Sequence, residues 1–182
     1  IFLLIACLTS ACIAESSSAL PLEAYTDPAS RFSFAIPQGW QASELPEENV
    51  LAFTPADYSG EITELRVLLF AVETDTFDTQ EHLDQANALL EPFLTKYLDE
   101  TYQVINQGET EVAKSPAVLL DFAKPYGDLY LEGRLVMVAM PGYVLAFLGM
   151  GESQAWEDFM PTFRAMLTEF QLLPLSEVTP TP

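Results

Sequence analysis

The sequence predicts an α+β domain in which a mainly antiparallel β-sheet is covered by two amphipathic helices. Seven segments are patterned as strands, and several of them are joined by short turns, which favours antiparallel pairing. Two longer segments repeat their apolar residues at helical spacing. The predicted order of elements is β-β-β-α-β-β-β-β-α, in which the helices supply the cover of the sheet.

Three strands are predicted before the first helix. Residues 31–37 alternate apolar side chains on one face and end at a proline, and a tight turn then leads into Trp40. Residues 50–54 form a second short strand. Residues 65–72 are apolar on both faces apart from Arg66, as expected of an interior strand that is covered on two sides.

The first helix is predicted to begin after Asp78. Asp78 and Glu81 have the spacing of a capping box, and apolar residues recur at helical spacing from Leu83 to Tyr97. Pro92 falls inside this pattern, so we expect it to kink or split the helix.

Four strands are predicted between the two helices. Gly108 marks a turn or bulge in the first of them. The dipeptide Pro141–Gly142 is typical of a turn and joins the last two into a hairpin. The four predicted strands are residues 103–112, 117–123, 128–140 and 143–150.

A final helix is predicted from Ser153, which is expected to cap it. Gly149 and Gly151 come just before it, but the third glycine of a phosphate-binding loop is absent, so we expect a plain turn there. An apolar stripe in this segment indicates packing against the sheet rather than a cofactor site. It consists of Trp156, Phe159, Phe163, Met166, Leu167 and Phe170.

The start of the chain is patterned as a bacterial lipoprotein signal. Residues 1–8 carry no charge and run into small residues, and both cysteines of the chain lie in this region. Cys7 and Cys12 each follow an alanine and fit the acceptor of a lipid anchor. We prefer Cys12 because it leaves a longer apolar run before the cleavage point, and Cys7 stays the alternative. Since the chain starts at Ile1 rather than Met, we expect the signal to continue upstream.

The composition of the rest of the chain predicts where the folded domain lies, and its charge limits the classes of partner. We expect a flexible linker over residues 13–29, a folded domain over 30–173 and a Pro/Thr-rich tail over 174–182. The chain has 7 basic and 27 acidic residues, a formal charge of -20. Such a surface repels phosphate backbones and anionic lipid headgroups, so nucleic acid is not an expected partner.

One segment resembles a known family. Residues 32–40 read aromatic-x-aromatic-x-Ile-Pro and then x-Gly-Trp, like the opening of PsbP-like domains and the related DcrB-like lipoproteins. The preceding Asp27, the order of the elements and the late Phe170 fit the same layout, over roughly residues 25–173. The resemblance implies an α/β sandwich with an antiparallel sheet between helices. Because the family includes extrinsic photosystem subunits, secreted lipoproteins and nuclear import factors, it implies no single function.

The residues expected in the folded domain do not form a catalytic pattern. His82 is the single histidine and is expected at the surface of the first helix, where it cannot complete a nucleophile triad or a zinc site. The acidic stretch 73–84 lacks the central glycine of a calcium-binding loop, and helix capping explains most of its acids. We therefore expect no enzyme activity, no cofactor and no metal.

Two groups of residues are candidates for a recognition surface. The first surrounds the opening turn, in the predicted loop 41–49, and the second is a pair of tyrosines around Pro125 and Gly127. The candidates are Trp40, Glu44, Glu47, Glu48, Tyr126 and Tyr130. Each has a competing structural role: the tryptophan as a plug of the hydrophobic core, the three glutamates as a solvated face and the two tyrosines as packing at a strand edge.

These observations favour a lipid-anchored, non-enzymatic binding or accessory domain in the bacterial cell envelope. It is expected outside the cytoplasmic membrane, with an acidic surface turned to a protein partner or a ligand. Two alternatives stay open, an envelope enzyme that uses carboxylates alone and a structural stabiliser of a membrane protein complex. A secreted protein without an anchor is the alternative location.

Overall fold

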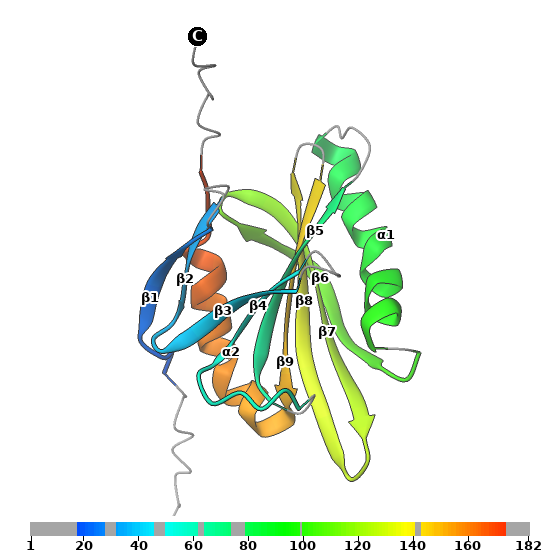
Figure 1. Cartoon of the computed structure of the whole chain (residues 1–182). Helices are drawn as coiled ribbons and strands as arrows, with labels where there is room; N and C mark the ends of the chain where they lie inside the picture. Colours follow the sequence, from blue (N-terminus) through cyan, green and yellow to red (C-terminus); the bar gives the residue numbers. More distant parts are fainter. Residues whose placement is uncertain are drawn as a thin grey trace, which may run out of the picture.

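The computed structural model has twelve regular elements in its described part (Figure 1). It describes residues 18–27, 32–45, 50–61, 64–73, 79–98, 100–140 and 143–173. The elements are β1 (Leu22–Thr26), β2 (Phe32–Pro37), β3 (Trp40–Leu45), β4 (Val50–Pro55), β5 (Arg66–Glu73), α1 (Thr79–Leu98), β6 (Gln103–Val112), β7 (Ser115–Tyr126), β8 (Leu129–Met140), β9 (Tyr143–Glu152), α2 (Ser153–Thr168) and β10 (Gln171–Leu172).

The strands form two antiparallel sheets. The large sheet has seven strands in the order β3-β4-β5-β9-β8-β7-β6, and the small one has three in the order β1-β2-β10. Every strand pair is antiparallel. β3 and β6 are therefore the edges of the large sheet, while β5 lies between β4 and β9 as its apolar pattern predicts. The α+β class predicted from the sequence is confirmed.

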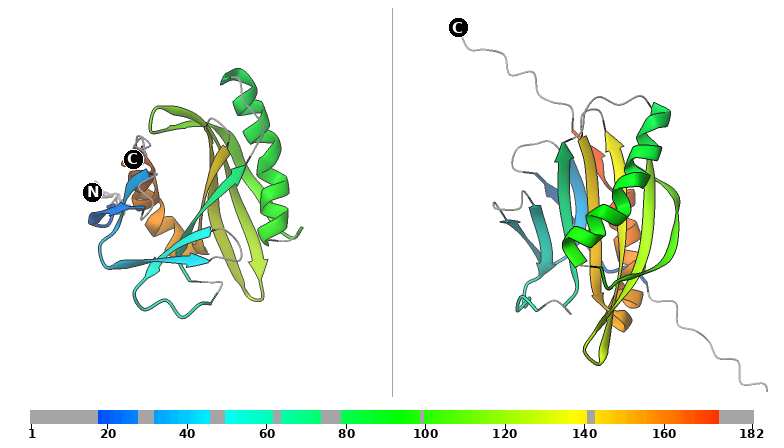
Figure 2. Two further views of the ribbon diagram at one scale, coloured as in Figure 1. Left: turned by 45° about the horizontal axis from the view of Figure 1, so that its top comes forward. Right: turned by 90° about the vertical axis from the view of Figure 1, so that its right-hand side faces the viewer.

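Helices cover the large sheet on both faces. α1 lies against one face, and α2 lies with the small sheet against the other (Figures 1 and 2). Each face carries its own buried cluster, because side chains alternate along every strand. Phe122, Leu135 and Leu148 point toward α1, whereas Val136 and Phe147 point toward α2. The sandwich implied by the family resemblance is thus the observed arrangement.

Aromatic rings join the small sheet to the large one. The ring of Phe34 in β2 meets Phe53 of β4 edge to face, with centroids 4.8 Å apart. Phe170, which follows α2, packs on Phe147 of β9 at 5.1 Å and on Phe32 at 5.8 Å. Such edge-to-face contacts add to the free energy gained by burying the rings. The alternating apolar side chains that predict the strand at 31–37 therefore also form the contact between the two sheets.

Three strands were not expected from the sequence. β1 lies inside residues 13–29, for which a linker was expected, and β3 occupies most of the expected loop 41–49. β10 has only two residues. β1 and β3 expose most of their side chains, so neither has the alternation of a half-buried strand. The expectation of a loop at 41–45 was wrong for this reason.

Several local expectations also change. The irregularity in β6 lies between Val104 and Asn106, whereas Gly108 pairs regularly with Leu119. Gly149 and Gly151 are inside β9, not in a turn, because the strand runs on to Glu152. α1 is not split at Pro92, since it runs from Thr79 to Leu98.

The start of α2 differs from the prediction. Its N-cap is Glu152, without a side-chain capping hydrogen bond. Ser153, the expected cap, instead donates from Oγ to the carbonyl of Tyr130 at 3.2 Å and to Oε1 of Glu132 at 3.0 Å. The serine therefore ties the helix to β8. The predicted aromatic stripe is buried as expected, including Trp156, Phe159 and Phe163.

Some predictions fall outside the described residues. These include the lipid acceptors Cys7 and Cys12, the capping residue Asp78 and the turn Pro141–Gly142. Met140 and Tyr143, which flank residues 141–142, nevertheless pair with each other, which confirms the hairpin of β8 and β9. None of the helices in the described ranges is both long and apolar enough to cross a membrane.

Candidate functional site

The β7–β8 hairpin carries the clearest exposed apolar surface of the described residues. Its tip projects beyond the body of the sheet (Figure 1). Tyr126 pairs with Leu129 across a turn in which Gly127 takes a positive φ of 61°, a conformation that suits glycine. The next pair is Pro125 with Tyr130.

Three large side chains at this tip lie open to solvent. Tyr126, Leu129 and Tyr130 are 47%, 42% and 59% exposed, and we call these three residues the hairpin tip. Tyr126 and Leu129 lie on the face that α1 covers further along the hairpin, while Tyr130 lies on the opposite face. The tip therefore presents apolar groups on both sides of a narrow ribbon.

The base of this hairpin is held on both faces. Lys124 is buried and donates from Nζ to the carbonyl of Leu98, the last residue of α1, at 2.5 Å. A cation at the carboxyl end of a helix also interacts favourably with the helix dipole. On the other face, Ser153 holds the backbone at Tyr130. The hairpin tip is thus presented by an anchored ribbon.

The edge strand beside the hairpin adds two exposed aliphatic residues. Val104 and Ile105 in β6 are 45% and 60% exposed and lie at the irregularity of that strand. Val104 pairs with Phe122 of β7, and Phe122 lies four residues before Tyr126 on the same strand. An irregularity of this kind twists an edge strand and discourages the addition of a further strand, so the backbone of β6 is a poor docking edge at this point.

No protein-family model matches the chain, and no curated protein sequence does either. Solved structures do match. Cyanobacterial PsbP (CyanoP) from Synechocystis sp. PCC 6803 superposes with a TM-score of 0.64 at 16% identity, over 91% of this chain and 98% of that one. The fold is PsbP-like.

Two further structures share the PsbP-like fold with this chain. LpqN of Mycobacterium tuberculosis, described as involved in cell envelope biogenesis, has a TM-score of 0.59 at 12% identity, over 84% of this chain and 92% of that one. The Ran-binding protein Mog1p of Saccharomyces cerevisiae has a TM-score of 0.61 at 9% identity, over 85% and 96%. The resemblance predicted from the sequence is confirmed for the fold. The different descriptions of these proteins show that the PsbP-like fold alone assigns no partner.

The motif that carries the resemblance has a structural role here. Gly39 takes a φ of 82° in the turn between β2 and β3, and its amide donates to Oε1 of Glu23 at 3.2 Å. Trp40 follows at once and stacks on Phe159 of α2, with centroids 5.0 Å apart and ring planes 4° from parallel. Trp40 is half-buried against the core, as the core-plug interpretation predicts. In this PsbP-like fold the motif therefore leads the chain from the small sheet into the large one.

The predicted recognition residues do not gather in one place. Trp40 and Glu44 lie on β3, and β4, β5 and β9 separate that edge from β8 in the sheet. Glu44 is exposed, whereas Glu47 and Glu48 lie outside the described residues. Tyr126 and Tyr130 come together at the hairpin tip with Leu129, which sequence reasoning missed. Its place directly after a turn dipeptide, in a register with Tyr126, was the signal that could have found it.

Metal-ligating side chains do not cluster in the described part of the structure. Within the described ranges, no group of three or more His, Cys, Asp or Glu side chains is placed to bind one. His82 lies in α1, but its side chain and most of the acidic stretch 73–84 are outside the described part.

Proposed function

We propose that this protein is a non-enzymatic binding or accessory domain of the bacterial cell envelope, held at the membrane by a lipid on Cys12 or Cys7. It docks on a protein partner through the hairpin tip. The observation that carries the proposal is the exposure of Tyr126, Leu129 and Tyr130 on an anchored ribbon. Tyrosine suits this role because its ring supplies a large contact area at a small cost in side-chain entropy.

The charge around the hairpin tip selects the chemistry of the partner. Asp128 lies exposed in the turn itself, and Glu152 lies exposed opposite Leu131 of β8. The whole chain carries -20. An anionic lipid surface repels such a tip, so its apolar side chains are not a membrane anchor. The fitting partner is a protein with an apolar pocket rimmed by lysine and arginine.

The short length of chain between the proposed anchor and the fold supports a partner close to the membrane. Leu22, where β1 begins, lies ten positions after Cys12 in the sequence. Fully extended, this stretch spans at most about 35 Å. The corresponding limit from Cys7 is about 50 Å. A domain tethered within that distance meets membrane proteins and their associated subunits at a high effective concentration, so even a modest affinity suffices.

The matched test compares two exposed leucines. Leu129 in the hairpin tip is 42% exposed, and Leu45 on the opposite edge of the sheet is 40% exposed. Leu129→Ser should lower recovery of the co-purifying partner from solubilised membranes about tenfold, as expected for a buried contact at the centre of an interface. Leu45→Ser should leave it unchanged. Equal recovery with both variants contradicts the assignment of the tip, and turnover of a substrate that is lost on mutation of an acidic residue contradicts the non-enzymatic role.

A further inference from the structure

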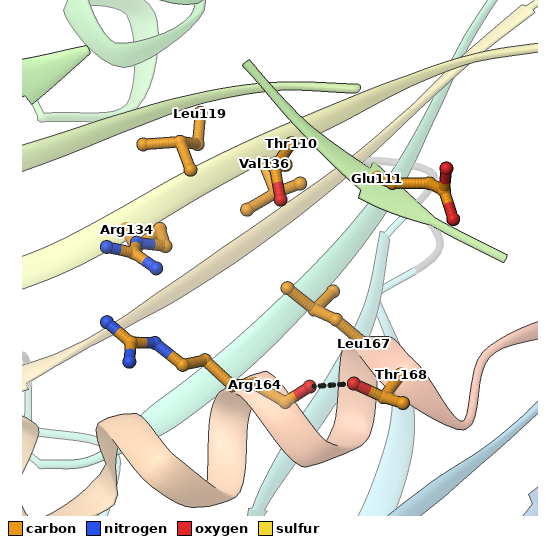
Figure 3. Close-up of a pocket in the computed structure, with 8 residues that line it drawn as sticks. All are labelled: Thr110, Glu111, Leu119, Arg134, Val136, Arg164, Leu167 and Thr168. Atoms are coloured by element: carbon orange, nitrogen blue, oxygen red, sulfur yellow. Dashed lines mark hydrogen bonds between the residues drawn. The ribbon is translucent and has the colours of Figure 1, made fainter. Parts of the chain in front are cut away.

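A small pocket lies between α2 and the large sheet (Figure 3). Its volume is about 160 Å³. Cavities of this size hold a group of a few heavy atoms, such as benzene. The pocket receives side chains from β6, β7 and β8 on one side and from α2 on the other: Thr110, Glu111, Leu119, Arg134, Val136, Arg164, Leu167 and Thr168.

Two of the seven basic residues of the chain line this one pocket, Arg134 and Arg164. Their guanidinium groups lie at the same end of it, one from β8 and the other from α2 (Figure 3). Since acids outnumber bases 27 to 7, two arginines that face each other are not what the composition favours. Like charges held together repel unless an anion lies between them.

Arg134 is fixed in place by Asp121. Its Nε and Nη2 donate to the two carboxylate oxygens of Asp121 at 2.5 and 2.8 Å, and the two side chains are only 12% and 17% exposed. Asn106 donates to Asp121 as well, at 3.2 Å. This arrangement leaves Nη1 of Arg134 without an acceptor among the described residues. The pair therefore orients Arg134 while its remaining donors stay available.

Arg164 has no such counter-ion. It lies exposed on α2, and the contact of this residue within the described chain is at its backbone carbonyl, which accepts from Oγ1 of Thr168 at 2.9 Å. No described carboxylate pairs with its guanidinium group. Next to it, the pocket wall is aliphatic, formed by Leu119, Val136 and Leu167. The site thus places the guanidinium group of Arg164, which can donate two parallel hydrogen bonds, beside an apolar surface.

We propose that this pocket binds a carboxylate attached to a short aliphatic chain. Arg164 forms the bidentate contact with the carboxylate, Nη1 of Arg134 donates to it from the other side, and the aliphatic chain lies on Leu167. A monoanion fits better than phosphate, because Asp121 already balances Arg134, which leaves the single charge of Arg164, and because the chain as a whole repels a dianion.

The test uses isovalerate as the probe and the full 182-residue chain in mild detergent, near physiological ionic strength. Isovalerate should shift the amide signals of α2 around residue 164 and of β8 around residue 134, while the neutral isovaleramide should not. Arg164→Gln should weaken isovalerate binding about tenfold, as expected for the loss of a charge-assisted hydrogen bond. Arg164 is exposed on a helix, so this variant keeps the fold.

The control removes the same charge elsewhere. Lys96 is exposed on α1, on the opposite face of the sheet, so Lys96→Gln should leave isovalerate binding unchanged. Three outcomes overturn the proposal: equal shifts from isovalerate and isovaleramide, unchanged binding by Arg164→Gln, or tighter binding of inorganic phosphate at the same residues.

Two sources can supply such a carboxylate, a free short-chain acid or the carboxyl terminus of a peptide. A pentapeptide that ends in leucine, compared with its amide, separates them. Tighter binding of the free-acid peptide than of isovalerate assigns the pocket to a chain terminus. Weaker binding of that peptide, with isovalerate still bound, assigns it to a free acid.

Discussion

Trp156 of α2 packs directly on Gly149 of β9. A methyl group at position 149 would lie 2.6 Å from Cη2 of Trp156 and 2.8 Å from Cε2 of Phe163, well inside van der Waals contact. The strand can lie this close to the helix only because residue 149 has no side chain. Gly149 is therefore a packing residue between sheet and helix, although its spacing with Gly151 first suggests a loop.

Gly149→Ala should destabilise the fold by about 1–3 kcal/mol, because both rings must move to admit the methyl group. Urea unfolding should show a lower midpoint with an unchanged slope. Gly108→Ala is the matched control: residue 108 is also in a strand, and nothing lies within 4 Å of the added group. Strand propensity favours alanine over glycine, so a control variant that is destabilised as much as Gly149→Ala would contradict the packing explanation.

Trp40→Ala should lower the free energy of unfolding by about 2 kcal/mol, less than for a fully buried ring, because Trp40 is half-buried in its stack on Phe159. Trp40→Phe should recover part of this loss. Partner recovery should be unaffected in both variants under conditions where they are folded. Loss of partner binding without loss of stability would instead assign Trp40 to the recognition surface.

Ser59 and Glu64 form a local clasp in the segment between β4 and β5. The hydroxyl of Ser59 donates to Oε1 of Glu64, and its amide donates to Oε2 at 2.6 Å. The hydroxyl bond, helped by the amides of Ser59 and Gly60, lowers the pKa of Glu64 below its ordinary value of 4.5. Because the pKa of Glu64 is lower in the folded state than in the unfolded state, the ionised carboxylate stabilises the folded state at pH values above the unfolded pKa. This contribution is lost as the pH falls through the folded pKa.

Ser59→Ala should therefore raise the pKa of Glu64 toward its ordinary value, as followed by carboxyl NMR titration. Ser59→Thr keeps a hydroxyl donor and should retain most of the depression. An unchanged pKa in Ser59→Ala would show that the backbone amides alone hold the carboxylate.

The proposed lipid anchor is tested by metabolic labelling with a radioactive fatty acid. Cys12→Ser should remove the label and release the protein from the membrane, whereas Cys7→Ser should keep both label and attachment. Loss of the label in Cys7→Ser alone would move the anchor to that residue. Label retained when both cysteines are replaced would exclude the lipoprotein assignment.

Most of the fold could be predicted because its central strands and helices bury one face or both. The alternation at 31–37, the apolar run at 65–72 and the aromatic stripe of α2 each follow from burial, and each is where it was predicted. β1 and β3 could not be predicted in this way, since their exposed side chains are under no such constraint.

The candidate site was predicted only in part, for a similar reason. Turn chemistry around Pro125 and Gly127 predicts that Tyr126 and Tyr130 lie at an exposed loop, which local sequence can show. Arg134 and Arg164 line the same pocket only because of the way α2 packs on the sheet. Residues thirty positions apart on different elements carry no shared local pattern.

The docking role of the hairpin tip is tested most directly by site-specific photocrosslinking in intact cells. A photoreactive phenylalanine at position 130 should give one discrete crosslinked species with a membrane-associated protein, and Leu129→Ser in the same chain should abolish it. The same probe at position 109, an exposed site on β6, should give none. Equal crosslinking from positions 130 and 109, or a crosslink at 130 that survives Leu129→Ser, would contradict docking through the tip.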